Sequence, residues 1–196
     1  MNKKTHRRFL PAFSLVELLV VIAIIGLLAA LTVPAMSSLM QSSDLTRGGQ
    51  VVADQVNLAR QTASAHNTVV ELRFIQLPDR AGYSAVQLWK SDSAGGMKPV
   101  RSPLTLPQSV TIAANPPLPG AMASLPTGTM TAGSAANTSY AALQIRPSGQ
   151  VTPTLSMSNL FFSIVPALSA SDSQLPPNYF ILQINPLTGV PLVYRP

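Results

Sequence analysis

Cysteine is absent from this chain of 196 residues, and charged residues make up only 10% of it. Without cysteine the chain has no disulfide, no thiolate nucleophile and no cysteine-ligated metal. Its two histidines, His6 and His66, have no partner at metal-ligand spacing, and Asp79, Asp92 and Asp172 are isolated acids in expected loops. We therefore expect no enzyme, no catalytic site, no metal and no cofactor.

The basic residues are unevenly distributed along the chain. The net charge is +6, from 13 Lys and Arg against 7 Asp and Glu, and four of the basic residues lie within the first eight positions. Without these four, nine basic residues remain against seven acidic ones, and they are scattered singly. The basic charge therefore indicates targeting, and nucleic acid is not an expected partner.

A long apolar segment follows the basic start. Residues 1–12 read MNKKTHRRFLPA, and residues 13–33 read FSLVELLVVIAIIGLLAALTV, in which Glu17 is the only charge. A helix of this length spans about 31 Å, which matches a hydrocarbon core of about 30 Å. We expect a single membrane span, with the basic flank in the cytoplasm and the C-terminal bulk outside.

Ordinary targeting signals fit this segment less well. A secretory signal peptide has a shorter apolar stretch, about 7–15 residues, without an internal charge. Arg7 and Arg8 resemble a twin-arginine signal, but Pro11 stands where an apolar residue is wanted. A permanent single-span anchor fits the length but gives no reason for Glu17, because an ionisable group in a membrane helix costs about 2.5–3.5 kcal/mol.

The stretch AFSLVE at residues 12–17, between a basic leader and a long apolar helix, resembles the cleavage and methylation motif of type IV prepilins and type II secretion pseudopilins. The resemblance implies cleavage by prepilin peptidase between Ala12 and Phe13, and N-methylation of Phe13. It also implies a role in assembly for Glu17, and loosening of the helix at Gly26 and Pro34. Ala12 stands where the family usually has glycine.

Cleavage before Phe13 would create a positive amine four residues from Glu17. In an apolar medium an unpaired charge is costly, so the amine of a neighbouring subunit could pair with this carboxylate. Such a pair would set the axial register between subunits.

Helical periodicity continues beyond the apolar segment. We predict one long, interrupted helix over residues 14–65, with Gly48-Gly49 weakening its middle. Apolar residues recur along its second half as a stripe that should lie against a sheet: Leu45, Val52, Val56, Ala59 and Ala63. The expected organisation is a cleaved leader (1–12), a transmembrane and assembly helix (13–34), an amphipathic helix half (35–65) and a β-rich globular domain (66–196).

The globular domain has seven segments of strand composition. They are residues 68–75, 83–90, 109–113, 140–146, 159–165, 179–185 and 190–194, and several alternate apolar and polar residues. Pro147-Ser148-Gly149 and Pro186-Leu187-Thr188-Gly189 predict tight turns. Residues 114–139, rich in Pro, Gly, Ala, Ser and Thr, predict a flexible surface loop. The fold class is therefore α+β, a long helix packed on an antiparallel β-sheet domain.

A long helix followed by antiparallel strands resembles the pilin fold. Three further stretches resemble the minor pseudopilin H class and its pilus-assembly relatives: LARQTA with VVEL (residues 58–63 and 69–72), LQIRPSG (143–149) and INPLTG (184–189). Val190 stands where that class usually has arginine. The chain also bears a looser resemblance to the cassette-encoded prepilin-like "protein D" family.

These resemblances imply a structural subunit, a minor one, of a type IV pilus-like or type II secretion pseudopilus filament. It would cross the inner membrane once, with its C-terminal domain periplasmic or extracellular, and assemble into the filament. The implied partners are prepilin peptidase, other pilin or pseudopilin subunits, inner-membrane lipid and the assembly platform. The alternative is a binding module displayed on such a filament, for DNA uptake or adhesion, which an exposed cluster of Lys or Arg would favour. Trp89, at a strand end, is interpreted as packing rather than as a ligand platform.

Overall fold

The computed structural model describes residues 13–114, 121–132, 135–172 and 174–195, except for the side chains of residues 31–38, 135 and 136. It divides into two compact units between Met40 and Gln41. The first unit contains the start of the long helix, and the second contains the rest of this helix and the described strands. Ala12 and the expected leader lie outside the described residues.

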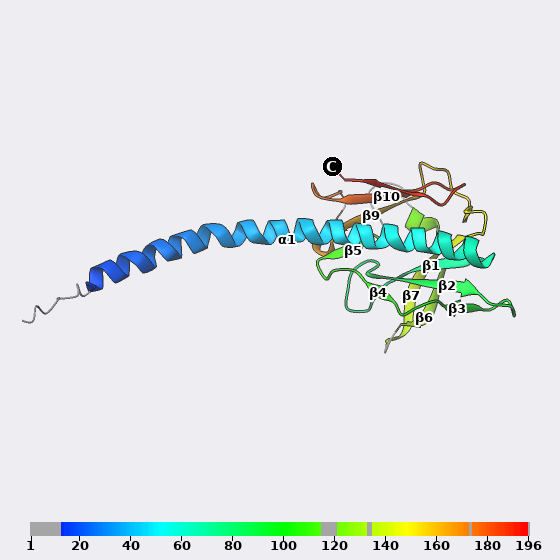
Figure 1. Cartoon of the computed structure of the whole chain (residues 1–196), viewed down its shortest axis with the longest axis horizontal. Helices are drawn as coiled ribbons and strands as arrows, with labels where there is room; N and C mark the ends of the chain where they lie inside the picture. The colour runs from blue at the N-terminus through cyan, green and yellow to red at the C-terminus, as the bar shows by residue number, and fades with distance from the viewer. Residues whose placement is uncertain (1–12, 115–120, 133–134, 173, 196) are drawn as a thin grey trace, which may run out of the picture. The chain divides into compact units, whose positions relative to one another are not determined.

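One helix, α1 (Leu15–His66), contains 52 residues and runs without a break through Gly48 and Gly49 (Figure 1). It begins after Ser14, whose hydroxyl oxygen accepts a hydrogen bond of 3.2 Å from the backbone N–H of Glu17. The predicted helix over residues 14–65 is thus confirmed, but the interruption expected within it is absent from the described backbone.

The C-terminal end of α1 is closed by its own backbone. Asn67 adopts a positive φ of 47°, a conformation that asparagine tolerates better than most residues. The N–H groups of Asn67 and Thr68 donate to the carbonyls of Ser64 and Ala63, respectively, which is the hydrogen-bond pattern of a Schellman motif. The chain can therefore turn sharply from the helix into the first strand.

In the described residues, eleven strands form two antiparallel sheets (Figure 1). The larger, sheet A, has the order β3-β2-β1-β7-β6, with β4 paired to β2 and β8 to β7. Its strands are β1 (Val70–Ile75), β2 (Ala85–Ser91), β3 (Met97–Pro99), β4 (Leu104–Thr105), β6 (Thr127–Ala132), β7 (Ala135–Ile145) and β8 (Val151–Thr152).

The smaller sheet, sheet B, has the order β11-β10-β9-β5. Its strands are β5 (Val110–Ile112), β9 (Phe161–Pro166), β10 (Phe180–Ile184) and β11 (Pro191–Tyr194). Two short 3-10 helices, η1 (Ala121–Ser124) and η2 (Ala167–Ser169), complete the described elements. All seven predicted strand segments contain a strand, at β1, β2, β5, β7, β9, β10 and β11.

One hydrophobic core joins the second part of α1 to both sheets. In Figure 1, β9 and β10 lie on one side of this helix, and β1 and β2 lie on the other. All five residues of the predicted stripe are buried, at Leu45, Val52, Val56, Ala59 and Ala63. The two sheets also meet directly, because the rings of Phe74 and Phe162 lie 4.8 Å apart between centroids. The predicted α+β class, with a long helix on antiparallel sheet structure, is confirmed.

The described part of residues 114–139 corrects the prediction of one flexible loop. It contains η1, β6 and the start of β7, and Ala121, Met122 and Leu125 are buried in the core. β6 pairs with β7 at the edge of sheet A. Its sequence, TGTMTA, has little of the bulky apolar content that marks a strand, so backbone pairing decides its structure.

The two predicted turns form and pack against each other. Gly149 and Gly189 both have positive φ, at 88° and 66°. A Cβ added to Gly189 would lie 2.7 Å from the carbonyl oxygen of Gly149, and a Cβ on Gly149 would lie 2.8 Å from that of Thr188. This backbone contact joins the β7–β8 turn of sheet A to the β10–β11 turn of sheet B.

Candidate functional site

The N-terminal end of α1 carries the predicted processing and assembly residues. The side chain of Phe13 is 75% exposed, and Glu17 is exposed as the third residue of the helix. Ser14 and Glu17 have the spacing of a capping box, and its first half is present because the Glu17 N–H donates to Ser14. A carboxylate in the first turn is also favoured by the helix dipole. The sequence interpretation missed this local role, although the spacing from serine to glutamate could have indicated it.

The rest of this N-terminal segment presents an apolar surface. The large side chains exposed between residues 15 and 28 are Leu15, Val16, Leu18, Leu19, Val20, Val21, Ile22, Ile24, Ile25, Leu27 and Leu28. A Cβ added at Gly26 would meet no atom within 4 Å. Close helix packing within the described chain therefore does not explain this glycine, and its expected loosening of the helix stays a prediction. The side chain of Pro34 lies outside the described residues.

Within the residues that the structure describes, no helix is long and apolar enough to cross a membrane.

A polar and aromatic cluster lies on the face of sheet A that points away from the core. The guanidinium of Arg73 lies 3.9 Å from the ring centroid of Trp89 and 4.3 Å from that of Tyr140. Its Nε donates to Glu71 at 2.7 Å, and the second carboxylate oxygen of Glu71 accepts a hydrogen bond from Gln144 at 3.1 Å. Arg73 is only 8% exposed. Trp89 is thus occupied by an intramolecular contact, in agreement with its interpretation as packing.

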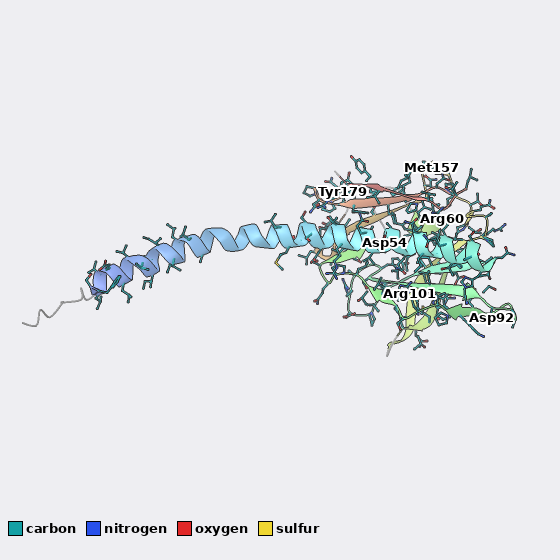
Figure 2. All side chains as sticks on the ribbon, viewed as in Figure 1. Asp54, Arg60, Asp92, Arg101, Met157 and Tyr179 are labelled. Carbon is teal, nitrogen blue, oxygen red and sulfur yellow. The ribbon has the colours of Figure 1, made fainter. Side chains whose placement is uncertain are left out.

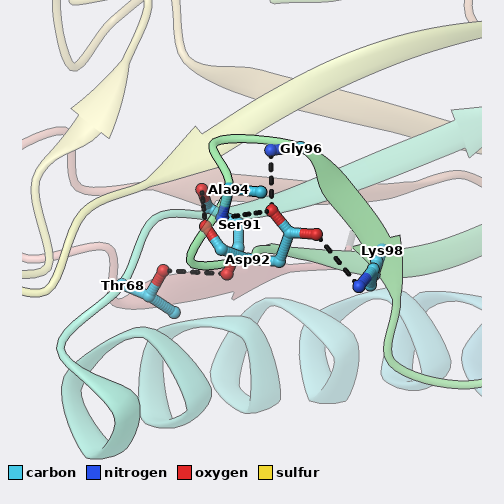
Figure 3. A network of polar contacts seen from close by, with 6 residues as sticks. All are labelled: Thr68, Ser91, Asp92, Ala94, Gly96 and Lys98. Carbon is cyan, nitrogen blue, oxygen red and sulfur yellow. Dashed lines mark hydrogen bonds and ion pairs between the residues drawn. The ribbon is translucent and has the colours of Figure 1, made fainter.

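The turn between β2 and β3 is organised by Asp92 (Figure 3). One carboxylate oxygen accepts hydrogen bonds from the N–H groups of Ala94 and Gly96, at 3.0 and 2.7 Å, and the other lies 3.0 Å from Nζ of Lys98. The hydrogen bond from Lys98 and those from the two N–H groups hold the pKa of this carboxyl below its ordinary value of 3.8. Asp92 therefore stabilises a hairpin turn.

Two arginines of the domain bind backbone or hydroxyl oxygens rather than acids. The guanidinium of Arg80 donates to the carbonyls of Leu106, Pro107 and Val110, which fastens the β1–β2 connection to the segment leading into β5. Arg195 donates to Ser42 and Thr46 on α1, which fastens the C-terminal end of the chain to the helix. Both arginines hold separate segments of the domain together.

Two lysines lie on neighbouring strands of sheet A. Lys90 and Lys98 stand directly opposite each other on β2 and β3, but Lys98 pairs with Asp92. Figure 2 shows Arg60, Arg101 and Asp92 apart from one another. The described residues contain no group of three His, Asp or Glu side chains placed to hold a metal ion.

Comparison with known proteins gives one structural similarity. No family model matches the chain, and no curated protein matches it. Among solved structures, it is similar to the minor pseudopilin EpsH from the type 2 secretion system of Vibrio cholerae, with 13% sequence identity and a TM-score of 0.44. The match covers 78% of this chain and 96% of that one.

Proposed function

We propose that this chain is a structural, minor subunit of a filament of the type IV pilus or type II secretion pseudopilus kind. Prepilin peptidase cleaves it between Ala12 and Phe13, and Phe13 is then N-methylated. Residues 13–34 anchor the subunit in the inner membrane before assembly and pack with other subunits in the filament. The globular domain stands on the outer side of that membrane.

The observation that carries this proposal is the combination of two properties in one helix. Near its start, Glu17 follows Phe13 by four positions, and the residues after Glu17 expose apolar side chains on all sides of the helix. Its later residues, from Leu45 to Ala63, bury one stripe in the core of an antiparallel domain. A helix that only packs on its own domain needs the buried stripe but not the exposed apolar segment. The exposed apolar segment therefore requires an apolar environment such as lipid or neighbouring helices.

N-terminal sequencing and intact mass of the chain extracted from membranes test the processing step. We expect a mature chain of 184 residues that begins at Phe13 and carries one added methyl group. A chain that begins near residue 30 or later would identify an ordinary signal peptide, and one that begins at Met1 would identify a permanent anchor. Either result would overturn the proposal.

A matched variant tests the unusual residue at the cleavage site. Ala12→Gly introduces the residue that the resembling family usually has at this position, so this variant should be processed at least as fast as the wild type. Ala12→Arg places a long charged side chain beside the bond to be cut and should accumulate as the uncut form. Pulse labelling follows the processing over time, and gel electrophoresis separates the uncut and cut forms by size. Equal processing of all three chains would show that this bond is not the one cleaved.

A further inference from the structure

We infer that the end of the globular domain around Gln41 contacts the surface of the bilayer, and that Leu168 enters its headgroup region. This inference rests on the proposed function, because it requires residues 13–34 to be the membrane anchor. Gln41 follows Pro34 by seven positions, and even a fully extended chain of seven steps reaches only about 25 Å. The domain surface next to Gln41 therefore remains within that distance of the apolar part of the membrane.

Leu168 is the most exposed of the large apolar side chains in the described part of the chain, at 93%. It lies on η2, between β9 and the loop that follows. Together with Gln41, Gln108, Ser109, Pro166 and Ala167, it lines a hollow of about 370 Å³. Leu168 is therefore presented at the same end of the domain as Gln41.

The backbone around Leu168 is held in place by hydrogen bonds. The N–H of Ala167 donates to the carbonyl of Ser109 at 2.8 Å, and the hydroxyl of Ser109 donates to Asp44 on α1 at 2.6 Å. Through Ser109, these two consecutive hydrogen bonds connect the segment that carries Leu168 to α1, the helix that leads to the anchor. Because this backbone is already ordered, little further backbone entropy is lost when Leu168 enters the membrane surface.

A second exposed residue at this end has the character of a membrane interface. Tyr194 is 59% exposed, and the next residue, Arg195, binds Ser42 and Thr46, one and five positions after Gln41. Tyrosine is enriched at the level of lipid headgroups, where its ring is apolar and its hydroxyl is wet. Asp172 is also exposed in the segment after η2, and its negative charge gives no attraction to anionic lipid. The contact should therefore be mainly apolar and should form on zwitterionic lipid.

The absence of cysteine allows a direct test, because each single substitution by cysteine gives one labelling site. Leu168→Cys, Leu187→Cys and Ile22→Cys are each labelled with a polarity-sensitive fluorophore in the full chain, which is reconstituted into zwitterionic vesicles. Leu187 is the matched control, because it is also an exposed leucine, at 69%, but lies in the β10–β11 turn. That turn lies beside Arg60, nineteen residues further along α1 than Gln41, or about 28 Å of helix.

Quenching by nitroxide-bearing lipids distinguishes the outcomes. We expect strong quenching at position 22, and quenching at position 168 that is several-fold greater than at position 187. Equal weak quenching at positions 168 and 187, with strong quenching at 22, would overturn the surface contact and leave the anchor intact. Absence of quenching at position 22 would overturn the anchor, and with it both the proposed function and this inference.

Discussion

Gly49 of α1 lies directly against the ring of Phe180 in β10. A Cβ added to this glycine would lie 2.5 Å from three atoms of the ring, a distance that real Cβ atoms do not adopt. The neighbouring Gly48 has a similar relation to Val110 of β5, where a Cβ would lie 2.9 Å from a methyl carbon. The paired glycines therefore let α1 approach sheet B closely, and they do not mark a break in the helix.

The close contact between the second part of α1 and both sheets indicates that the domain can fold without residues 1–34. We expect a chain consisting of residues 35–196 to be soluble and to unfold cooperatively, because the core contains the second part of α1 and both sheets. Thermal unfolding followed by circular dichroism is the measurement. A gradual, non-cooperative loss of signal would show that the domain needs residues 1–34.

Gly49→Ala should destabilise this domain. Alanine in place of glycine favours a helix by about 1 kcal/mol, but overpacking a core costs about 1–3 kcal/mol, and Phe180 is fully buried in this core. We expect a net loss of up to about 2 kcal/mol in the free energy of unfolding. Phe180→Leu should lower the free energy of unfolding of the wild-type domain, and it should lower it less in the Gly49→Ala background. Additive effects in this double-mutant cycle would contradict the contact.

The secondary structure of the domain could be predicted because its signals are local. The stripe from Leu45 to Ala63 follows from helical spacing, and seven strands follow from composition and alternation. The remaining strands gave no usable signal, because β3, β4 and β8 contain only two or three residues and β6 is rich in threonine and glycine. Their positions depend on pairing with distant strands, which no local pattern contains.

The contacts between side chains could not be predicted in the same way. Arg73, Trp89 and Tyr140 are far apart in the sequence, and they meet because β1 pairs with β2 and β7 in one particular register. A shift of one residue would have placed these side chains on opposite faces. The N-terminal segment is the reverse case, because the motif that contains Phe13 and Glu17 is visible in the sequence, and the structure adds the capping role of Ser14.

Arg73 should be required for stability mainly because Glu71 would otherwise be buried without a cation. The two side chains are only 10% and 11% exposed, and removal of one partner from a buried pair costs about 3–5 kcal/mol. Arg73→Met keeps the apolar stem of the side chain, so we expect a loss at the lower end of this range. Adding Glu71→Gln to Arg73→Met should restore a large part of the lost stability. Urea unfolding of the single and double variants measures both effects, and the absence of any recovery would contradict this account.

The stabilisation from Asp92 should depend on pH. Because its pKa is lowered in the folded state, its contribution is present above the ordinary value of 3.8 and is lost as the pH falls through the lower, folded-state pKa. Asp92→Ala should therefore lower the melting temperature at neutral pH and have a smaller effect once the pH is below the folded-state pKa. Carbon-detected NMR titration of the carboxyl measures the pKa directly, and Lys98→Gln should raise it. A titration midpoint at or above the ordinary value would contradict the network in Figure 3.

The charge of Glu17 should be needed for filament assembly and not for the start of the helix. The contact with Ser14 is made by the backbone N–H of residue 17, and glutamine is also preferred at this position of a capping box, so Glu17→Gln keeps the contact and removes only the negative charge. Membrane insertion should be unchanged or slightly better, because a neutral amide costs less in lipid than a carboxylate. Cleavage should persist, because Ala12 and Phe13 are unchanged.

Assembly of the Glu17→Gln chain should fall, because the amine of an incoming subunit loses its partner in an apolar medium. An unpaired buried charge costs several kcal/mol, and each 1.4 kcal/mol changes an equilibrium about tenfold. The measurement compares the chain in filaments sheared from cells with the processed pool that remains in the membrane. Ser14→Ala is the control, since it weakens the helix cap and retains the carboxylate, and it should assemble far better than Glu17→Gln. Normal incorporation of the glutamine variant would show that this carboxylate does not set the register between subunits.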